Sequence, residues 1–239
     1  LAVFLFDYRC FGGSDGSPRN LVDPKRHCED WAAAIDHVRS LQTIDARRMA
    51  LWGSSFSGGH VIVTAARKPG IIAAIVAQVP FVDAISTSLK LGPKHLMRAL
   101  PHGIRDLSRM LTFRAPHYVK VVGKPDEFAV MNTPESYGGY TAIIPEDTDW
   151  ENGCPARILL KFAAYRPTAH AKNVKCPALL MAGEYDSLIN IKAVEKAANK
   201  MPNGELVKYP LGHFDLYKGD AFADAVQKQT DFLLTHLAN

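Results

Sequence analysis

Short apolar runs recur near both ends of the chain and are separated by segments with a single apolar face. Five of these runs predict strands, over residues 1–7, 48–52, 71–78, 178–182 and 205–209. In the most apolar of them the apolar positions are continuous rather than alternating, which is typical of a parallel strand covered by helices on both faces. Strands that alternate with helices therefore predict an α/β fold built on a mostly parallel sheet covered by helices.

The segments between these strands have helical patterns. Asp23 followed by Pro24 predicts a helix N-terminus, because aspartate caps free backbone N–H groups and proline is tolerated in the first turn. The helix that follows places four apolar residues on one face, namely Cys28, Trp31, Ile35 and Val38. Further helices are predicted over residues 60–68, 191–201 and 220–237.

The regular alternation is lost between residues 83 and 172. This stretch is rich in proline, glycine, histidine and aromatic residues, and it has no long apolar strand. Its helical patches are residues 93–100, 104–111 and 155–162. A connection of this length between two core strands is too long for a simple loop. We therefore predict that residues 1–82 and 173–239 form one core and that residues 83–172 form an inserted helical cap.

The composition limits the class of protein. The chain has 239 residues, of which 47% are hydrophobic and 22% are charged, which suits a soluble globular protein with a substantial core. The net charge of +4 is mild and the basic residues are scattered, so we expect no nucleic acid partner. The longest apolar run, residues 71–77, is as long as a strand and too short for a membrane span. The expected partner is a small-molecule substrate, and no pattern indicates the oligomeric state.

Cysteine and histidine usage indicates neither a disulfide framework nor a metal site. The four cysteines lie far apart and form no Cys-x-x-Cys motif: Cys10, Cys28, Cys154 and Cys176. They indicate free thiols in a reducing compartment, and hence a cytoplasmic location, although any targeting segment upstream of Leu1 would lie outside this sequence. The histidines show no paired ligand spacing, and the Gly12-Gly13 loop lacks the signature of a phosphate-binding loop, so we expect no metal and no cofactor.

Ser55 is the candidate nucleophile. It lies in residues 52–59, between a predicted strand and a predicted helix, and its flanking residues are small: Gly53, Ser54, Ser57 and Gly58. A serine in this setting is the sequence form of a nucleophile elbow, a turn so tight that large flanking side chains would collide. The turn would expose the Ser55 hydroxyl and direct the backbone N–H of Phe56 towards a developing oxyanion. The usual pattern is Gly-x-Ser-x-Gly, and Ser57 stands where its last glycine is expected.

A serine nucleophile requires a base that accepts its proton and an acid that orients the base. Groups that follow different strands of a parallel sheet meet at one edge, so the candidates are sought directly after the predicted strands. Asp186 follows the strand over residues 178–182, and His213 follows the strand over residues 205–209. We therefore predict Ser55, Asp186 and His213 as nucleophile, acid and base.

The acid has competitors in the sequence. Glu184 precedes Asp186 by two residues, and a carboxylate at either place could also cap a helix. Asp83 follows another predicted strand, but we expect it to lie at the N-terminus of the cap instead. Asp215 is too close to His213 in sequence to orient its imidazole.

Together these motifs resemble the α/β-hydrolase superfamily, in the branch that contains serine aminopeptidase-like and dienelactone-hydrolase-like members. Residues 7–16 resemble the segment that follows the family's fourth strand, with Cys10 where glycine is usual. Residues 50–59 resemble the elbow, and residues 177–186 and 209–214 resemble the acid and histidine segments. The order of serine, acid and histidine along the chain is also that of the family.

The resemblance also implies parts that have no match here. Family members begin with three more strands, and a loop after the third supplies a second oxyanion-hole N–H. That third strand lies between the strands that correspond to residues 1–7 and 48–52, so we expect either an unpaired gap or a new pairing there. The resemblance thus predicts an N-terminally truncated α/β-hydrolase fold. Losing one oxyanion donor costs about 10²–10³ in rate, so we expect weak activity or none if this chain is the whole molecule.

The predicted function is that of a serine hydrolase, which cleaves an ester, thioester or amide bond of a small, fairly apolar substrate through an acyl-enzyme. One alternative is a non-catalytic α/β-hydrolase-like binding domain, which the unmatched strands and the residues Cys10 and Ser57 favour. The complete order of serine, acid and histidine argues against it. Acyl transfer or carbon–carbon bond hydrolysis would use the same triad, and the sequence does not separate these reactions from hydrolysis of an acyl bond.

Overall fold

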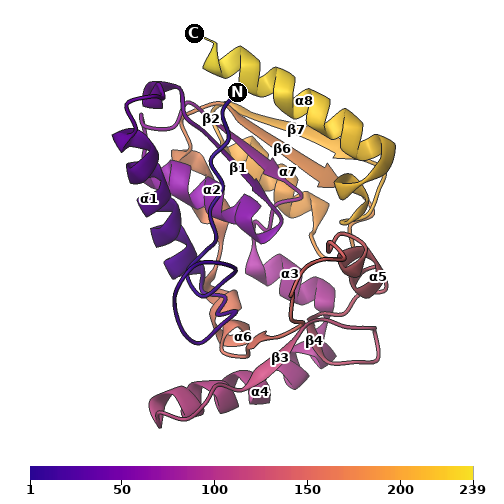
Figure 1. The fold of residues 1–239 in the computed structure, drawn as a ribbon. Coiled ribbons are helices and arrows are strands. Elements are labelled where there is room, and N and C mark those ends of the chain that lie inside the picture. The colour runs from indigo at the N-terminus through magenta and orange to yellow at the C-terminus, as the bar shows by residue number, and fades with distance from the viewer. Residues whose placement is uncertain (239) are drawn as a thin grey trace.

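The computed structural model describes residues 1–238 and shows a parallel four-stranded sheet with helices on both faces (Figure 1). The strands, in the order β1-β2-β6-β7, are β1 (Ala50–Ser54), β2 (Ala74–Gln78), β6 (Ala178–Gly183) and β7 (Gly204–Tyr209). The covering helices are α1 (Pro24–Ser40), α2 (Phe56–Arg67), α7 (Ile191–Lys200) and α8 (Gly219–Leu237). The predicted α/β fold with a mostly parallel sheet is confirmed.

The two faces of the sheet have separate hydrophobic cores. On one face Ile75 of β2 is buried in a cluster to which α1, α2 and α7 contribute. On the other face the neighbouring Val76 is buried with Phe232 of α8. Successive side chains of a strand point to opposite faces, so a strand covered on both sides needs apolar residues at nearly every position. This arrangement explains the continuous apolar runs of β2 and β6.

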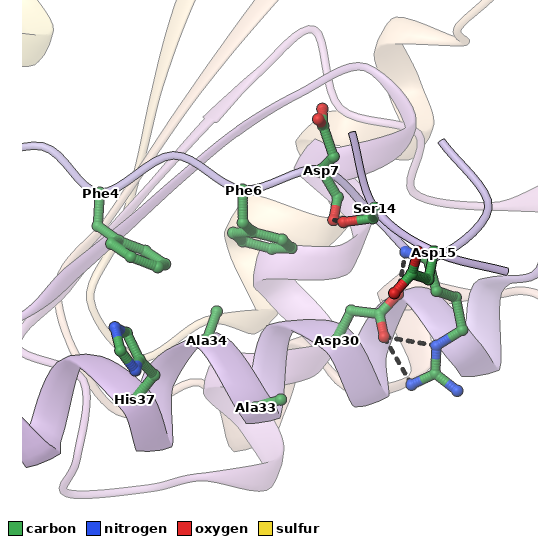
Figure 2. A pocket seen from close by; sticks show the side chains of 10 residues that line it. Phe4, Phe6, Asp7, Ser14, Asp15, Asp30, Ala33, Ala34 and His37 are labelled. Carbon is green, nitrogen blue, oxygen red and sulfur yellow. Dashed lines mark hydrogen bonds and ion pairs between the residues drawn. The ribbon is translucent and has the colours of Figure 1, made fainter. Parts of the chain in front are cut away.

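Residues 1–7 do not form a strand, and that prediction is wrong. In Figure 2 Phe4 and Phe6 lie over α1, and the Phe4 ring is 5.4 Å from the ring of His37, centroid to centroid. A cavity of about 750 Å³ lies between residues 1–8 and the edge of β1. An apolar run becomes a strand only where a neighbouring strand supplies backbone partners, and none of the described residues does so here. Of the two expected outcomes, gap or new pairing, the structure has the gap.

The other core elements agree with the predictions, with shifted ends. Asp23 caps α1 as expected, accepting hydrogen bonds from the backbone N–H groups of Lys25 (3.1 Å) and Arg26 (3.4 Å). Helix α2 begins at Phe56, directly after the candidate nucleophile and four residues earlier than predicted. A short 3₁₀ helix over Ala46–Arg48 precedes β1 and delays the start of that strand.

Residues 83–172 contribute no strand to the parallel sheet. Their helices are α3 (Ala84–Leu91), α4 (Pro93–Leu111), α5 (Ser136–Thr141) and α6 (Ile158–Lys161). Their strands, β3 (Tyr118–Val122), β4 (Ala129–Met131) and β5 (Cys154–Pro155), form a separate sheet in the order β4-β3-β5. The remaining 3₁₀ helices of the chain are Phe162–Ala164, Pro167–Ala169, Ala171–Asn173 and Asp215–Tyr217.

The two helical patches predicted over residues 93–111 are one continuous helix, α4, with Pro101 inside it. Proline removes one backbone donor, but Pro101 and Met97 are both exposed, so water can bind the carbonyl group that is left unpaired. The third patch is shorter than predicted and forms α6. No helix in the described part of the chain is long and apolar enough to cross a membrane.

Candidate active site

Ser55 lies at a strained turn between β1 and α2. Its backbone has φ 51° and ψ −117°, and a positive φ is uncommon for residues other than glycine, with a cost of about 1–3 kcal/mol. The turn is fixed by neighbouring backbone: the Ser55 N–H donates to the Gln78 carbonyl (2.9 Å), and the Ser55 carbonyl accepts from the Phe81 N–H (2.8 Å). A Cβ atom on Gly53 would lie 2.5 Å from the Ser57 carbonyl oxygen, so the flanking residue must be small.

Ser57, which departs from the usual glycine, makes a specific contact. Its hydroxyl lies 2.7 Å from the hydroxyl of Tyr8, which in turn accepts a hydrogen bond from Trp31 Nε1 (2.8 Å). Burial raises the pKa of Tyr8 to about 12, so its hydroxyl is neutral at pH 7. The serine therefore connects the elbow to the segment that precedes α1.

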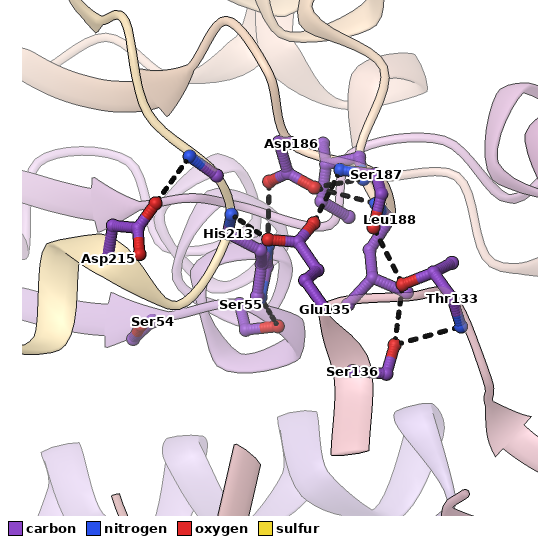
Figure 3. A network of polar contacts seen from close by, with 12 residues as sticks. Ser54, Ser55, Thr133, Glu135, Ser136, Asp186, Ser187, Leu188, His213 and Asp215 are labelled. Atoms are coloured by element: carbon purple, nitrogen blue, oxygen red, sulfur yellow. Dashed lines mark hydrogen bonds and ion pairs between the residues drawn. The ribbon is translucent and has the colours of Figure 1, made fainter. Parts of the chain in front are cut away.

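The three predicted residues come together at the carboxyl edge of the parallel sheet (Figure 3). The His213 Nε2 atom lies 3.0 Å from the Ser55 hydroxyl oxygen, and its Nδ1 atom lies 2.7 Å from a carboxylate oxygen of Asp186. His213 and Asp186 are 2% and 3% exposed, so the ion pair that a protonated imidazole would form is shielded from water. The arrangement can remove a proton from the serine hydroxyl and hold the resulting imidazolium.

The loop that carries Asp186 is fixed from two sides. The second carboxylate oxygen of Asp186 accepts hydrogen bonds from the backbone N–H groups of Leu188 (2.8 Å) and Ile189 (2.7 Å). Lys90 of α3 donates to the Ile189 carbonyl (2.9 Å) and also contacts the Asp186 carbonyl. The acid thus has a fixed orientation, with one oxygen left for the imidazole.

Phe56, the predicted oxyanion-hole residue, begins α2. Its backbone N–H donates no hydrogen bond to another group within residues 1–238. The first N–H groups of a helix have no intrahelical acceptor and lie at the positive end of the helix dipole. This N–H is therefore available to a negatively charged oxygen next to Ser55.

The competing carboxylates occupy other positions. Glu184 is exposed, and its carboxylate does not contact His213. Asp83 caps helix α3 by accepting from the Ser86 N–H (3.1 Å), and it pairs with Arg166 (3.1 Å). Asp215 accepts from the Gly212 N–H (2.9 Å) and so stabilises the histidine loop without orienting the ring.

Glu135, which the sequence did not single out, joins the two loops that carry Asp186 and His213 (Figure 3). One carboxylate oxygen accepts from the Ser187 N–H (2.7 Å), and the other accepts from the His213 N–H (3.0 Å). A Cβ atom on Gly212 would lie 2.3 Å from this carboxylate, which accounts for the glycine before the histidine. The only sequence signal at Glu135 is a carboxylate at the start of a helical segment, and that signal predicts a helix cap.

Three neutral hydroxyl groups beside Glu135 add further contacts between residues 133–136 and the acid loop. The Ser187 hydroxyl donates to the Thr133 hydroxyl (2.6 Å), which also lies 2.7 Å from the Ser136 hydroxyl. Residues 133–136 therefore bind the acid loop through both a carboxylate and a hydroxyl.

Two other buried histidines, His27 and His60, lie next to each other, and His60 is in α2, the helix that follows the elbow. His60 of α2 lies 3.2 Å from His27 of α1 and 2.5 Å from the Tyr165 hydroxyl, measured from its ring nitrogens. No carboxylate among the described residues hydrogen-bonds either ring. Burial lowers the pKa of His27 to about 4 and lowers that of His60 well below its usual value. Both rings are neutral at pH 7.

Within residues 1–238 no group of three or more histidine, cysteine, aspartate or glutamate side chains is arranged to hold a metal ion. The cavity beside β1 and a smaller one of about 420 Å³ beside α1 (Figure 2) are not lined by Ser55, Asp186 or His213.

Comparison with known proteins gives a consistent result. The family model for serine aminopeptidase, S33, matches residues 1–213. Quorum-quenching protein AidA of Acinetobacter baumannii (strain MDR-ZJ06) is 37% identical over 232 residues, covering 97% of this chain and 76% of AidA. Thiohydrolase apmlB of Arthrinium phaeospermum is 24% identical over 254 residues, covering 100% of this chain and 80% of that protein.

A solved structure also matches nearly the whole length of this chain. DcsB in complex with its substrate analogue superimposes with a TM-score of 0.82 at 25% sequence identity, covering 96% of this chain and 79% of that one. The likeness extends over the parallel sheet and over residues 83–172, since nearly the whole chain is matched.

Proposed function

The chain belongs to the serine aminopeptidase S33 family and is an α/β-hydrolase enzyme, and from this premise we propose that it cleaves an ester, thioester or amide bond of a small, fairly apolar substrate with Ser55, His213 and Asp186. One observation carries the proposal: His213 lies within hydrogen-bond reach of both Ser55 (3.0 Å) and Asp186 (2.7 Å).

The positions of Ser55, His213 and Asp186 support the following steps of acylation and deacylation. The Ser55 oxygen attacks the acyl carbon while His213 Nε2 takes the hydroxyl proton. Asp186 balances the positive charge on the imidazole, and the Phe56 N–H donates to the oxyanion. His213 then gives the proton to the leaving group, and an acyl-enzyme remains on Ser55. Water, deprotonated by the same imidazole, releases the acid and restores the serine.

The substrate class rests on the relatives and on residues 83–172. A thiohydrolase among the relatives supports a thioester as one of the candidate bonds. Residues 83–172 supply Lys90 and Glu135, which contact the acid and histidine loops, so we assign this segment as a cap that covers the site and sets specificity. In this assignment residues 1–82 and 173–239 form the core.

Glu135 is assigned as a positioning residue. It does not reach the reacting atoms, but its two hydrogen bonds fix the distance between the loop of Asp186 and the loop of His213. The angle at which the imidazole meets Ser55 depends on both loops, and small errors of alignment are costly in catalysis.

The decisive experiment is labelling with a fluorophosphonate, combined with turnover of p-nitrophenyl and acyl-thioester substrates. We expect the chain to be labelled on Ser55 and to release product in both assays. The Ser55→Ala variant should lose labelling, and its kcat should fall by about 10⁴ or more, because removal of the nucleophile leaves only binding and the oxyanion donor. Equal labelling and turnover in the variant would disprove the assignment, and a folded chain that is never labelled would favour the non-catalytic alternative.

A further inference from the structure

Helix α4 presents an apolar stripe to solvent. Apart from the adjacent pair Leu96 and Met97, the stripe residues recur at intervals of three or four, and all six lie along one side of the helix. They are Leu96, Met97, Leu100, Ile104, Leu107 and Leu111, all of them exposed. Met97 is 75% exposed, and Phe113, just after the helix, is 100% exposed. A continuous exposed apolar surface of this kind marks a place of contact with another molecule or with a membrane.

The stripe is not the face by which α4 packs on its own chain. That face carries four buried residues, His95, Ala99, Gly103 and Asp106. A Cβ atom on Gly103 would lie 2.7 Å from Leu160, so the helix already packs closely there. Asp106 forms a buried ion pair with Arg157, with a shortest distance of 2.7 Å. The inner side of α4 is thus fully occupied, and its apolar stripe is a second, separate surface.

The charges around the stripe have one sign. Between residues 93 and 114 every exposed or half-exposed charged side chain is basic: Lys94, Arg98, Arg105, Arg109 and Arg114. The only acidic residue in this range, Asp106, is buried and neutralised by Arg157. A helix with an apolar stripe and a basic polar face has the properties of a segment that lies in the plane of a membrane surface.

We propose that α4 binds the surface of a membrane that contains anionic lipids, with the apolar stripe among the acyl chains and the basic residues near the headgroups. Figure 1 shows α4 at the end of the molecule away from the parallel sheet, where a flat surface can reach it. The apolar stripe gives binding to any bilayer, and the basic residues add attraction to anionic headgroups that falls with salt.

A second copy of the chain fits this surface less well. Two copies of α4 packed stripe to stripe would bury the apolar residues but leave the basic side chains, which lie on another side of the helix, with no acidic partner from either helix. Anionic lipids cover the stripe and also complement the basic residues. The proposal does not depend on the catalytic role of Ser55, and its test needs no turnover.

The test is co-sedimentation of the full chain with vesicles of phosphatidylcholine alone or with 30% phosphatidylserine. We expect binding to the mixed vesicles to be at least tenfold tighter than to neutral ones, and to weaken about tenfold between 0.05 and 0.5 M salt. The double variant Met97→Gln/Ile104→Gln should lower binding to both vesicles about tenfold. Arg98→Gln/Arg105→Gln should lower binding to the mixed vesicles only.

The matched control is Phe222→Gln/Val226→Gln, which changes two exposed apolar residues of α8 and should leave vesicle binding unaltered. All these positions are exposed, so the variants are expected to fold, and their melting temperatures check this. Absence of binding to the mixed vesicles at low salt would overturn the proposal. So would binding that survives both α4 variants, or sedimentation velocity showing a dimer that Met97→Gln/Ile104→Gln dissociates.

Discussion

Two buried histidine sites lie beside the same elbow and differ in their partners. His213 hydrogen-bonds the Asp186 carboxylate and the Ser55 hydroxyl, whereas the hydrogen bonds of the His60 ring go to the neutral groups of His27 and Tyr165. The imidazole rings of His213, His60 and His27 are all nearly inaccessible to water. Burial without a carboxylate opposes protonation, whereas a carboxylate at 2.7 Å can balance the charge on an imidazolium. The hydrogen-bond partner, rather than the degree of burial, therefore distinguishes a histidine that can transfer a proton from one that only packs against its neighbours.

The largest expected effect comes from removing that carboxylate. Asp186→Asn should lower kcat by about 10³–10⁴, because an amide stabilises the wrong imidazole tautomer and cannot balance the charge. His27→Phe, the matched change in the neutral site, should retain kcat within about threefold, since phenylalanine keeps the ring that stacks on Tyr8. Turnover of a p-nitrophenyl ester measures both. Similar losses of kcat in Asp186→Asn and His27→Phe would contradict the difference between the two histidine sites.

The next effect is on stability in acid. In the unfolded chain His27 titrates near 6.5, but in the folded chain its pKa is about 4, so the folded state resists a proton that the unfolded state accepts. Its contribution to stability is complete above pH 6.5 and decreases as the pH falls towards 4, by about 3 kcal/mol. Urea unfolding at pH 7 and pH 4 measures the change.

The same measurement on His27→Phe isolates this group from the carboxylates, which titrate alike in both proteins. The variant should lose about 3 kcal/mol less between the two pH values than the wild type. An identical loss in both proteins would show that His27 does not resist protonation.

The smallest expected effect comes from changing Glu135, which holds the loops of Asp186 and His213 in alignment. Glu135→Gln should lower kcat about tenfold with little change in KM, because glutamine offers one acceptor oxygen where two N–H groups need one each. Glu135→Ala should lower kcat further, so that glutamine is a partial rescue. Glu184→Gln, at an exposed carboxylate of the neighbouring loop, is the control and should be neutral.

The positioning role of Glu135 can be separated from a purely structural one. A positioning residue changes kcat and the rate of fluorophosphonate labelling in parallel while the KM for substrate is retained. If both Glu135 variants only lower the melting temperature and leave kcat at the wild-type value, the carboxylate merely holds the cap in place.

The sequence predicted most of the sheet, and the three residues that it proposed as the triad lie next to one another in the structure. Ser55, Asp186 and His213 each follow a strand, and the parallel arrangement of strands then determines where they lie. Their catalytic roles stay a prediction until the variants are measured.

What the sequence missed depends on contacts between distant segments. Residues 1–7 have the composition of a strand, but a strand also needs a backbone partner, which no local pattern can supply. Glu135 contacts the loops of Asp186 and His213 only because residues 133–136 fold against them. These contacts could not be inferred before the path of residues 83–172 was known.

The choice of partners by Glu135 has a consequence for engineering. Both of its hydrogen bonds go to main-chain amides, so they do not specify the side chain at position 187 or any other core residue. Chimeras that replace residues 83–172 with the corresponding segment of a relative would need to restore a carboxylate at this point, with one oxygen for each N–H group, to keep the two loops in register. Under the proposed assignment of this segment as the cap that sets specificity, such chimeras would exchange substrate range between family members while residues 1–82 and 173–239 are left unaltered.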